Sequence, residues 1–161
     1  MIVSVFDYGA GNLHSLVKVL EGGGATVRVE SDASRLGEAG ALVLPGVGGF
    51  AQAAGRLAII PGRVTALKAS RVPQLGWNTV DDADDPLFAA APLGVAWFAN
   101  SFVARPADRR AVVAWSTHED DRFPAAVRAG RAIGVQFHPE KSSRAGVAFV
   151  HAWLREAAAC S

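Results

Sequence analysis

The chain has 161 residues, of which half are apolar and 19% are charged, and its formal net charge is +1 at pH 7. This length fits one domain over residues 1–161. The charge gives no sign of a nucleic-acid partner, and no apolar run approaches the roughly 18 residues needed to cross a membrane. The only cysteine is Cys160, which cannot form a disulfide within the chain, so we expect a reducing compartment, the cytoplasm.

The first 49 residues alternate between predicted strands and one helix. Residues 2–6 are a short apolar run, and a glycine turn separates them from apolar residues at helical spacing over 13–20. The glycines at 22–24 end this helix, and residues 26–29 and 41–44 are two further strands. Strands alternating with a helix favour a parallel sheet.

The rest of the chain has a different pattern. Residues 63–67, 95–103 and 111–116 are β-rich runs separated by turns, which indicates hairpins or a meander. Residues 132–137 form another strand, and 143–159 carry apolar side chains at helical spacing, which predicts a closing amphipathic helix. We therefore expect an α/β fold with a mixed sheet.

The strongest chemical motif is Gly134-Val-Gln-Phe-His-Pro-Glu-Lys-Ser142. It places His138 just past a strand end, with a proline in the turn and Glu140 two residues later. A carboxylate beside an imidazole fixes its tautomer and stabilises the imidazolium, so this pair suits a general base and its orienting acid. Taken alone, the pair fits a structural or surface loop better than a catalytic site.

Five segments together resemble a known family. They are residues 8–12, 45–48, 60–64, 73–78 and 136–142, and they resemble in order the glutaminase subunit of imidazole glycerol phosphate synthase, a class I glutamine amidotransferase. The resemblance implies a flavodoxin-like or Rossmann-like mixed sheet flanked by helices. It also implies a Cys-His-Glu triad that hydrolyses glutamine and passes ammonia to a cyclase partner, a (β/α)8 barrel, in histidine biosynthesis. No cofactor and no metal are expected, since no histidine pair has metal-ligand spacing.

The resemblance also assigns roles to individual residues. His138 matches the base and Glu140 matches the orienting acid. The residues that match the oxyanion and substrate-binding positions are Gly46, Val47, Gly48 and Ser101. The positions that resemble the docking surface for the barrel are Asn12, Trp77 and Lys141. Without the resemblance, these last three read as a turn asparagine, a half-buried core tryptophan and a solvated lysine.

One part of the family pattern is missing. In the family, a strand ending in a cysteine-bearing nucleophile elbow lies between the segments matched by 45–48 and 60–64. This chain has only residues 50–58 there, enough for one short helix. A strand, an elbow and a helix need about 30 residues. We therefore interpret the region near 50–58 as an internal deletion that removed the central strand, the elbow, its helix and the nucleophile.

Other residues are poor substitutes for that nucleophile. Cys160 follows the predicted last helix, where the helix dipole disfavours a thiolate. Ser142 and Ser143 are next to His138, but serine there resembles a loop-fixing residue. Asn100 and Phe102 stand where the family carries polar or aromatic residues that line the glutamine site.

Three hypotheses remain open. The chain is a glutaminase with an unrecognised nucleophile, a non-catalytic subunit that docks on a barrel using free ammonia, or a truncated product without a native role. The first is disfavoured, because loss of a covalent nucleophile costs on the order of a million-fold in turnover. Loss of a central strand also leaves edges to re-pair, so we expect partial re-pairing and marginal stability of the isolated chain.

Overall fold

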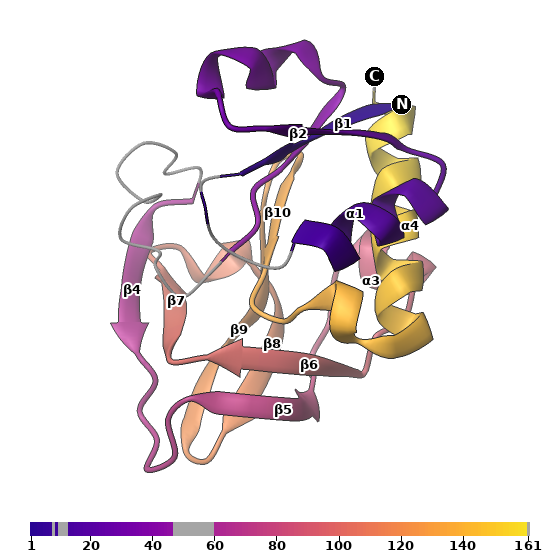
Figure 1. Ribbon diagram of the computed structural model, residues 1–161. Helices are drawn as coiled ribbons and strands as arrows, with labels where there is room; N and C mark the ends of the chain where they lie inside the picture. Colours follow the sequence, from indigo (N-terminus) through magenta and orange to yellow (C-terminus); the bar gives the residue numbers. More distant parts are fainter. Residues whose placement is uncertain (8, 10–12, 47–59, 161) are drawn as a thin grey trace.

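The computed structural model describes residues 1–7, 9, 13–46 and 60–160. Two parts are distinguished by their strands: an N-terminal lobe, residues 1–46, and a C-terminal lobe, residues 60–160 (Figure 1). The last helix belongs to the C-terminal lobe and runs alongside both. Within the described ranges no helix is long and apolar enough to cross a membrane.

The N-terminal lobe is a parallel sheet with one crossing helix. Strand β1 (Ile2–Phe6) lies between β2 (Thr26–Glu30) and β3 (Ala41–Val43), and it pairs in parallel with both. Helix α1 (Leu13–Gly22) connects β1 to β2, and a 3-10 turn, η1 (Ala33–Glu38), connects β2 to β3. The predicted parallel strands and the predicted helix are confirmed.

Glycines end α1, as predicted. The N–H of Gly23 donates to the carbonyl of Val19, and the N–H of Gly24 donates to that of Glu21. Gly24 has φ +86°, a left-handed conformation that glycine adopts without the steric cost of a Cβ. The chain can therefore reverse sharply into β2.

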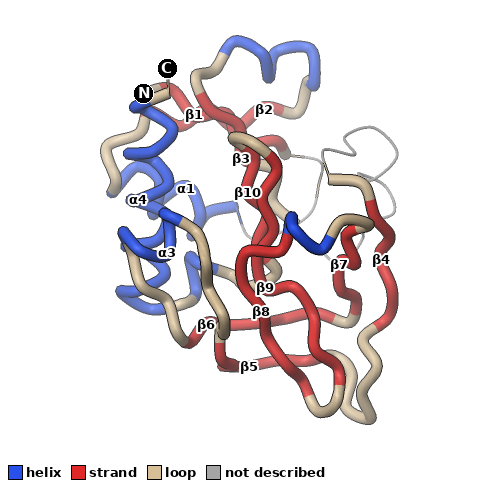
Figure 2. Tube along the Cα trace, turned by 180° about the vertical axis from the view of Figure 1, so that it is seen from behind, coloured by secondary structure: helices blue, strands red, loops and turns tan. Residues whose placement is uncertain are grey.

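The C-terminal lobe is built from antiparallel strands (Figures 1 and 2). A two-stranded ribbon pairs β4 (Gly62–Ala66) with β7 (Phe102–Pro106), and a second pairs β5 (Gln74–Thr79) with β6 (Val95–Asn100). A meander is formed by β8 (Val112–His118), β9 (Asp121–Ala129) and β10 (Ala132–Val135). A short 3-10 turn, η2 (Arg109–Ala111), precedes the meander. The expected α/β fold with parallel and antiparallel strands is confirmed.

The sequence-based prediction was wrong in several details of this lobe. The predicted strand over 95–103 is two strands, β6 and β7, separated at Ser101. Strand β9 was missed because Pro124 interrupts its pattern. Pro124 lies opposite Trp115, next to a register shift, where a residue without an N–H is tolerated in a sheet. Strand β5 was also missed.

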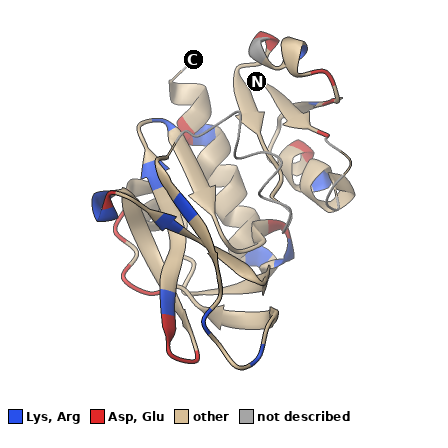
Figure 3. Ribbon diagram, turned by 90° about the vertical axis from the view of Figure 1, so that its left-hand side faces the viewer, with Lys and Arg blue, Asp and Glu red and all other residues tan. Residues whose placement is uncertain are grey.

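Two helices complete the lobe. Helix α3 (Pro86–Ala90) was not predicted, although Asp85 accepts a hydrogen bond from the N–H of Leu87 and a proline opens the first turn, both common helix-start features. Helix α4 (Ser143–Ala159) has the predicted bounds and follows a 3-10 turn, η3 (Pro139–Lys141). Basic and acidic residues are distributed over both lobes (Figure 3), in keeping with the small net charge.

A partly buried ionic cluster ties α3 and α4 to β9. Arg128 Nη2 donates to Asp85 Oδ1 at 2.9 Å, and Arg128 Nη1 donates to Glu156 Oε1 at 2.7 Å. The side chain of Asp85 is 2% exposed and that of Arg128 is 18% exposed. The hydrogen bond with Asp85 raises the pKa of Arg128. The carboxylates of Asp85 and Glu156 are therefore both paired with the guanidinium of Arg128, which extends from β9.

Replacing Arg128 by Ala should lower the free energy of unfolding by about 3 kcal/mol, because the buried carboxylate of Asp85 loses its cation. The matched control is Arg110→Ala, which removes an ion pair with Asp108 in which the two side chains are 91% and 55% exposed. This variant should lower the free energy of unfolding far less, because exposed ion pairs contribute little. Urea denaturation of both variants measures the difference. Equal losses in the two variants would contradict a structural role for the Arg128 cluster.

Candidate active site

The histidine and the glutamate predicted as base and orienting acid are brought together. His138 follows β10, and Pro139 begins the η3 turn that carries Glu140 back toward it. His138 Nδ1 lies 3.0 Å from Glu140 Oε1. A carboxylate can only accept, so Nδ1 is the donor, and in the neutral imidazole Nε2 remains an acceptor. This is the tautomer that a general base requires.

Glu140 is held in its charged form. Burial raises the pKa of its carboxyl, but the hydrogen bond from His138, a backbone N–H and the nearby charges of His138 and Lys141 lower it more, so its pKa lies below the ordinary value. The side chains of His138 and Glu140 are 28% and 10% exposed. The imidazole is thus partly open to solvent, while its orienting acid is mostly covered.

A backbone clamp holds the loop that carries His138. The N–H of His138 donates to the carbonyl of Trp97 in β6 at 2.8 Å. The N–H of Trp97 donates to Ser142 Oγ at 2.9 Å, and Ser142 Oγ donates to the carbonyl of His138 at 2.6 Å. These three residues form a closed ring of hydrogen bonds. The position of the histidine is therefore set by β6 and by the start of α4.

The serines and the cysteine weighed as nucleophiles are placed elsewhere. Both hydrogen bonds of the Ser142 hydroxyl are used in the clamp, and the residue is 1% exposed, which fits the predicted loop-fixing role. Ser143 is exposed at the start of α4, with φ +60°. Cys160 is exposed at the other end of this 17-residue helix, about 25 Å from its first turn at 1.5 Å per residue.

The residues predicted for the oxyanion and substrate-binding positions are only partly described. Gly46 lies just past β3 in the N-terminal lobe and is exposed, whereas Val47 and Gly48 lie outside the described residues. Ser101 separates β6 from β7, and its carbonyl accepts from the N–H of Leu67. It is four residues beyond Trp97, which is about 13 Å along an extended strand. These roles stay predictions.

Asn100 points into the core. It is 6% exposed and pairs across the sheet with Gln74, which is 4% exposed. Its Nδ2 donates to the carbonyl of Phe102, while Asn100 Oδ1 and Gln74 Oε1 have no hydrogen-bond partner among the described residues. Asn100 is thus enclosed beside β5. Phe102, by contrast, is 47% exposed.

The predicted docking residues Trp77 and Lys141 lie on the surface. Trp77 is 54% exposed, so about half of it is accessible to a partner, and Lys141 is exposed on η3. Trp77 stands opposite Trp97 in the sheet, with ring centroids 5.8 Å apart in an edge-to-face arrangement. Leu75 and Val95 are exposed on the same side of this ribbon, since directly paired and alternate residues share a face. We call Leu75, Trp77 and Val95 the apolar ribbon face. Asn12 lies outside the described residues.

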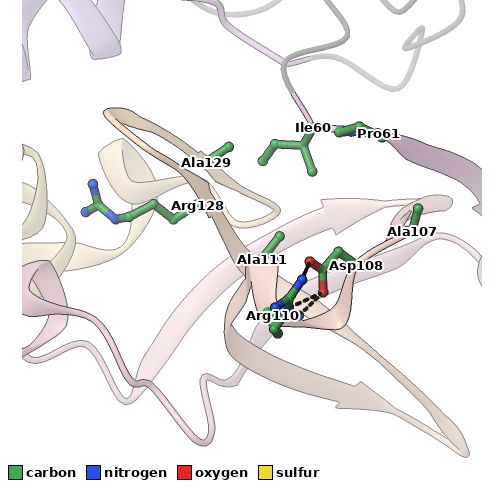
Figure 4. A pocket seen from close by; sticks show the side chains of 8 residues that line it. All are labelled: Ile60, Pro61, Ala107, Asp108, Arg110, Ala111, Arg128 and Ala129. Atoms are coloured by element: carbon green, nitrogen blue, oxygen red, sulfur yellow. Dashed lines mark hydrogen bonds and ion pairs between the residues drawn. The ribbon is translucent and has the colours of Figure 1, made fainter.

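A separate hollow lies in the C-terminal lobe (Figure 4). It is lined by Ile60, Pro61, Ala107, Asp108, Arg110, Ala111, Arg128 and Ala129. Asp108 and Arg110 satisfy each other there with a hydrogen-bonded ion pair. The hollow contains neither member of the His138–Glu140 pair.

Comparison with solved structures identifies the fold. A GMP synthase subunit from Thermoplasma acidophilum superimposes with a TM-score of 0.76 at 17% identity, over 99% of this chain and 95% of that one. PurLQS from Thermotoga maritima superimposes with a TM-score of 0.74, also at 17% identity, over 96% and 98%. The sequence model of the family Glutamine amidotransferase class-I matches residues 52–155. The chain belongs to the class I glutamine amidotransferases.

Sequence relatives narrow the family further. Imidazole glycerol phosphate synthase subunit HisH of Leifsonia xyli is 34% identical over 203 aligned positions, covering 94% of this chain and 97% of that protein. The HisH subunit of Corynebacterium diphtheriae is 31% identical over 206 positions, covering 94% and 97%. Within its class, the chain is therefore a member of the HisH subunit family, as its motifs predicted.

The alignment with the Corynebacterium diphtheriae relative is longer than this chain. The 206 aligned positions exceed the 161 residues of the chain, so at least 45 of them, 206 less 161, are gaps on the side of this chain. Nearly all of the relative is nevertheless covered. The length difference therefore falls inside the alignment.

Sequence reasoning missed the role of Trp97. Nothing in the local sequence marks this residue, because its contribution to the site comes through backbone atoms of a strand 41 positions before His138. The one signal in the sequence was the pair of tryptophans at 77 and 97, because aromatic residues often pair across adjacent strands.

Replacing Ser142 by Ala should free the histidine loop. The buried N–H of Trp97 loses its acceptor, so the free energy of unfolding should fall by about 1–3 kcal/mol. Amide exchange at residues 138–141 should accelerate more than at β8, measured by hydrogen-exchange mass spectrometry. Ser31→Ala, at an exposed serine, is the control and should leave both unchanged. Unchanged exchange in the loop of Ser142→Ala would contradict the clamp.

Proposed function

We propose that the chain is a non-catalytic HisH-type subunit that docks on a cyclase partner, a (β/α)8 barrel, in histidine biosynthesis, without hydrolysing glutamine. The partner then takes its ammonia from solution. The assembly is a heterodimer in the cytoplasm. The region near residues 50–58, where the family resemblance implies a nucleophile strand, is the proposed place of the deletion. The gaps inside the alignments support an internal deletion.

The position of the cysteine is the main support for the proposed absence of glutamine hydrolysis. The base and its orienting acid are in hydrogen-bond contact, yet the only cysteine of the 161 residues lies at the far end of α4. A thiolate must reach both the base and the acyl carbon of the substrate. Cys160 is about 25 Å from the start of the helix that follows the histidine loop, so it cannot meet either condition.

Docking is supported by the apolar ribbon face. Leu75, Trp77 and Val95 are 70%, 54% and 48% exposed on one side of the β5–β6 ribbon. Exposed apolar side chains gathered on one surface mark interaction sites more often than isolated ones do. Tryptophan is also enriched among residues that dominate binding energy. The ribbon contacts the histidine loop through Trp97, so docking there would occur next to the retained pair.

The proposal is tested by two turnover measurements with a cyclase subunit from the same source. Glutamine-dependent release of glutamate should stay at the background rate, with or without the cyclase, while the cyclase with ammonium salts should turn over normally. His138→Ala should change neither rate. Glutamate release at ordinary enzyme rates, lost in His138→Ala, would contradict the proposal and favour a glutaminase with another nucleophile.

Docking needs its own measurement. Isothermal titration with the cyclase subunit should give a saturable complex, and Trp77→Ala should weaken it by at least tenfold, since a large exposed anchor is removed. Val64→Ala removes an exposed apolar residue from β4 and should leave the affinity unchanged. A complex that is equally tight in both variants would exclude the ribbon as the docking surface, and the absence of any complex would favour a relic.

A further inference from the structure

The buried core is divided into two clusters that follow the two lobes. The cluster in the N-terminal lobe contains Val3, Val5 and Leu20, with Val150 and Leu154 from α4. The larger cluster lies in the C-terminal lobe and includes Phe98, Val103, Phe123 and Phe137, with Phe149 and Ala152 from α4. Among the described residues, α4 is the element that contributes buried side chains to both clusters.

The contacts between the lobes gather on α4 and the turn before it. Helix α1 packs against α4 and lies beside η3. His151 Nε2 lies 3.0 Å from the carbonyl of Val19, and Trp153 packs partly buried against both clusters. Gly23 also sits against His151 and Leu154, where an added Cβ would collide with both. The joint is thus one side of a single helix.

The strand ladders do not cross this joint within the described ranges. Strands β1, β2 and β3 pair only with one another, and β3 is at the end of its sheet. Strands β8, β9 and β10 form their own sheet, with β10 at its end. Backbone hydrogen bonding makes each sheet cooperative, but it does not link the two described sheets.

We propose that the N-terminal lobe undocks from α4 and unfolds as a cooperative unit while the C-terminal lobe stays folded. Separate cores joined through one helix face are the arrangement in which part of a protein opens at a lower free energy than the whole. The movement also acts on the site. Gly46 belongs to the N-terminal lobe, whereas His138 and Glu140 belong to the C-terminal lobe, so undocking separates the predicted oxyanion segment from the base pair.

Native-state hydrogen exchange on the full chain tests this directly. Amides of β1, β2 and α1 should exchange together, at least tenfold faster than the slowest amides of β8 and β9. Their exchange should depend on urea with a smaller slope than global unfolding, because the surface exposed by one lobe is smaller. A single exchange rate and urea slope shared by the slowest amides of both lobes would overturn the proposal.

Two matched core variants separate the lobes further. Leu20→Ala should speed exchange in the N-terminal lobe by about a hundredfold or more, and it should speed the slowest β8 and β9 amides similarly, because these exchange through global unfolding, which also exposes Leu20. Val103→Ala should speed exchange of the slowest C-terminal amides alone, because Val103 stays buried when only the N-terminal lobe opens. If the N-terminal lobe of Leu20→Ala no longer folds, the proposal is supported when the amides of β8 and β9 remain protected from exchange. Loss of protection in both lobes of Leu20→Ala, or acceleration of the N-terminal amides by Val103→Ala, overturns it.

Discussion

Packing against α4 is the constraint on which the rest of the structure depends. This helix buries Val150 and Leu154 under the parallel sheet and Phe149 and Ala152 under the antiparallel strands. Its first turn is also preceded by Ser142, whose hydroxyl fixes the histidine loop to β6. One helix therefore holds the two lobes together and positions the candidate site, so a disturbance of its packing reaches both.

The His138–Glu140 pair has a geometry that does not require a nucleophile. Its contact is made within one short turn, and the loop is held by Trp97 and Ser142 through backbone atoms. Nothing in these bonds depends on a neighbouring cysteine strand. A deletion between Gly49 and Ile59 can thus leave the pair intact. The pair fits the family shown by the sequence comparisons, but it does not by itself imply turnover.

Much of the fold could be predicted from local patterns. The helical spacing over 13–20 and the glycines after it gave α1 and its end, and the apolar spacing after Ser142 gave α4. Strand β9 was missed, because Pro124 is acceptable only through a register shift that depends on β8. Local patterns also predict neither the division of the core nor the bond between His138 and Trp97, since both arise from residues far apart in the sequence.

The central claim is that the chain keeps a working half of a catalytic site and lacks only the nucleophile segment. Replacing residues 50–58, between Gly49 and Ile59, by the corresponding segment of the Corynebacterium diphtheriae HisH relative tests it. The inserted chain, mixed with the cyclase, should release glutamate from glutamine, and His138→Ala should abolish this release. A folded inserted chain that binds the cyclase but releases no glutamate would contradict the claim.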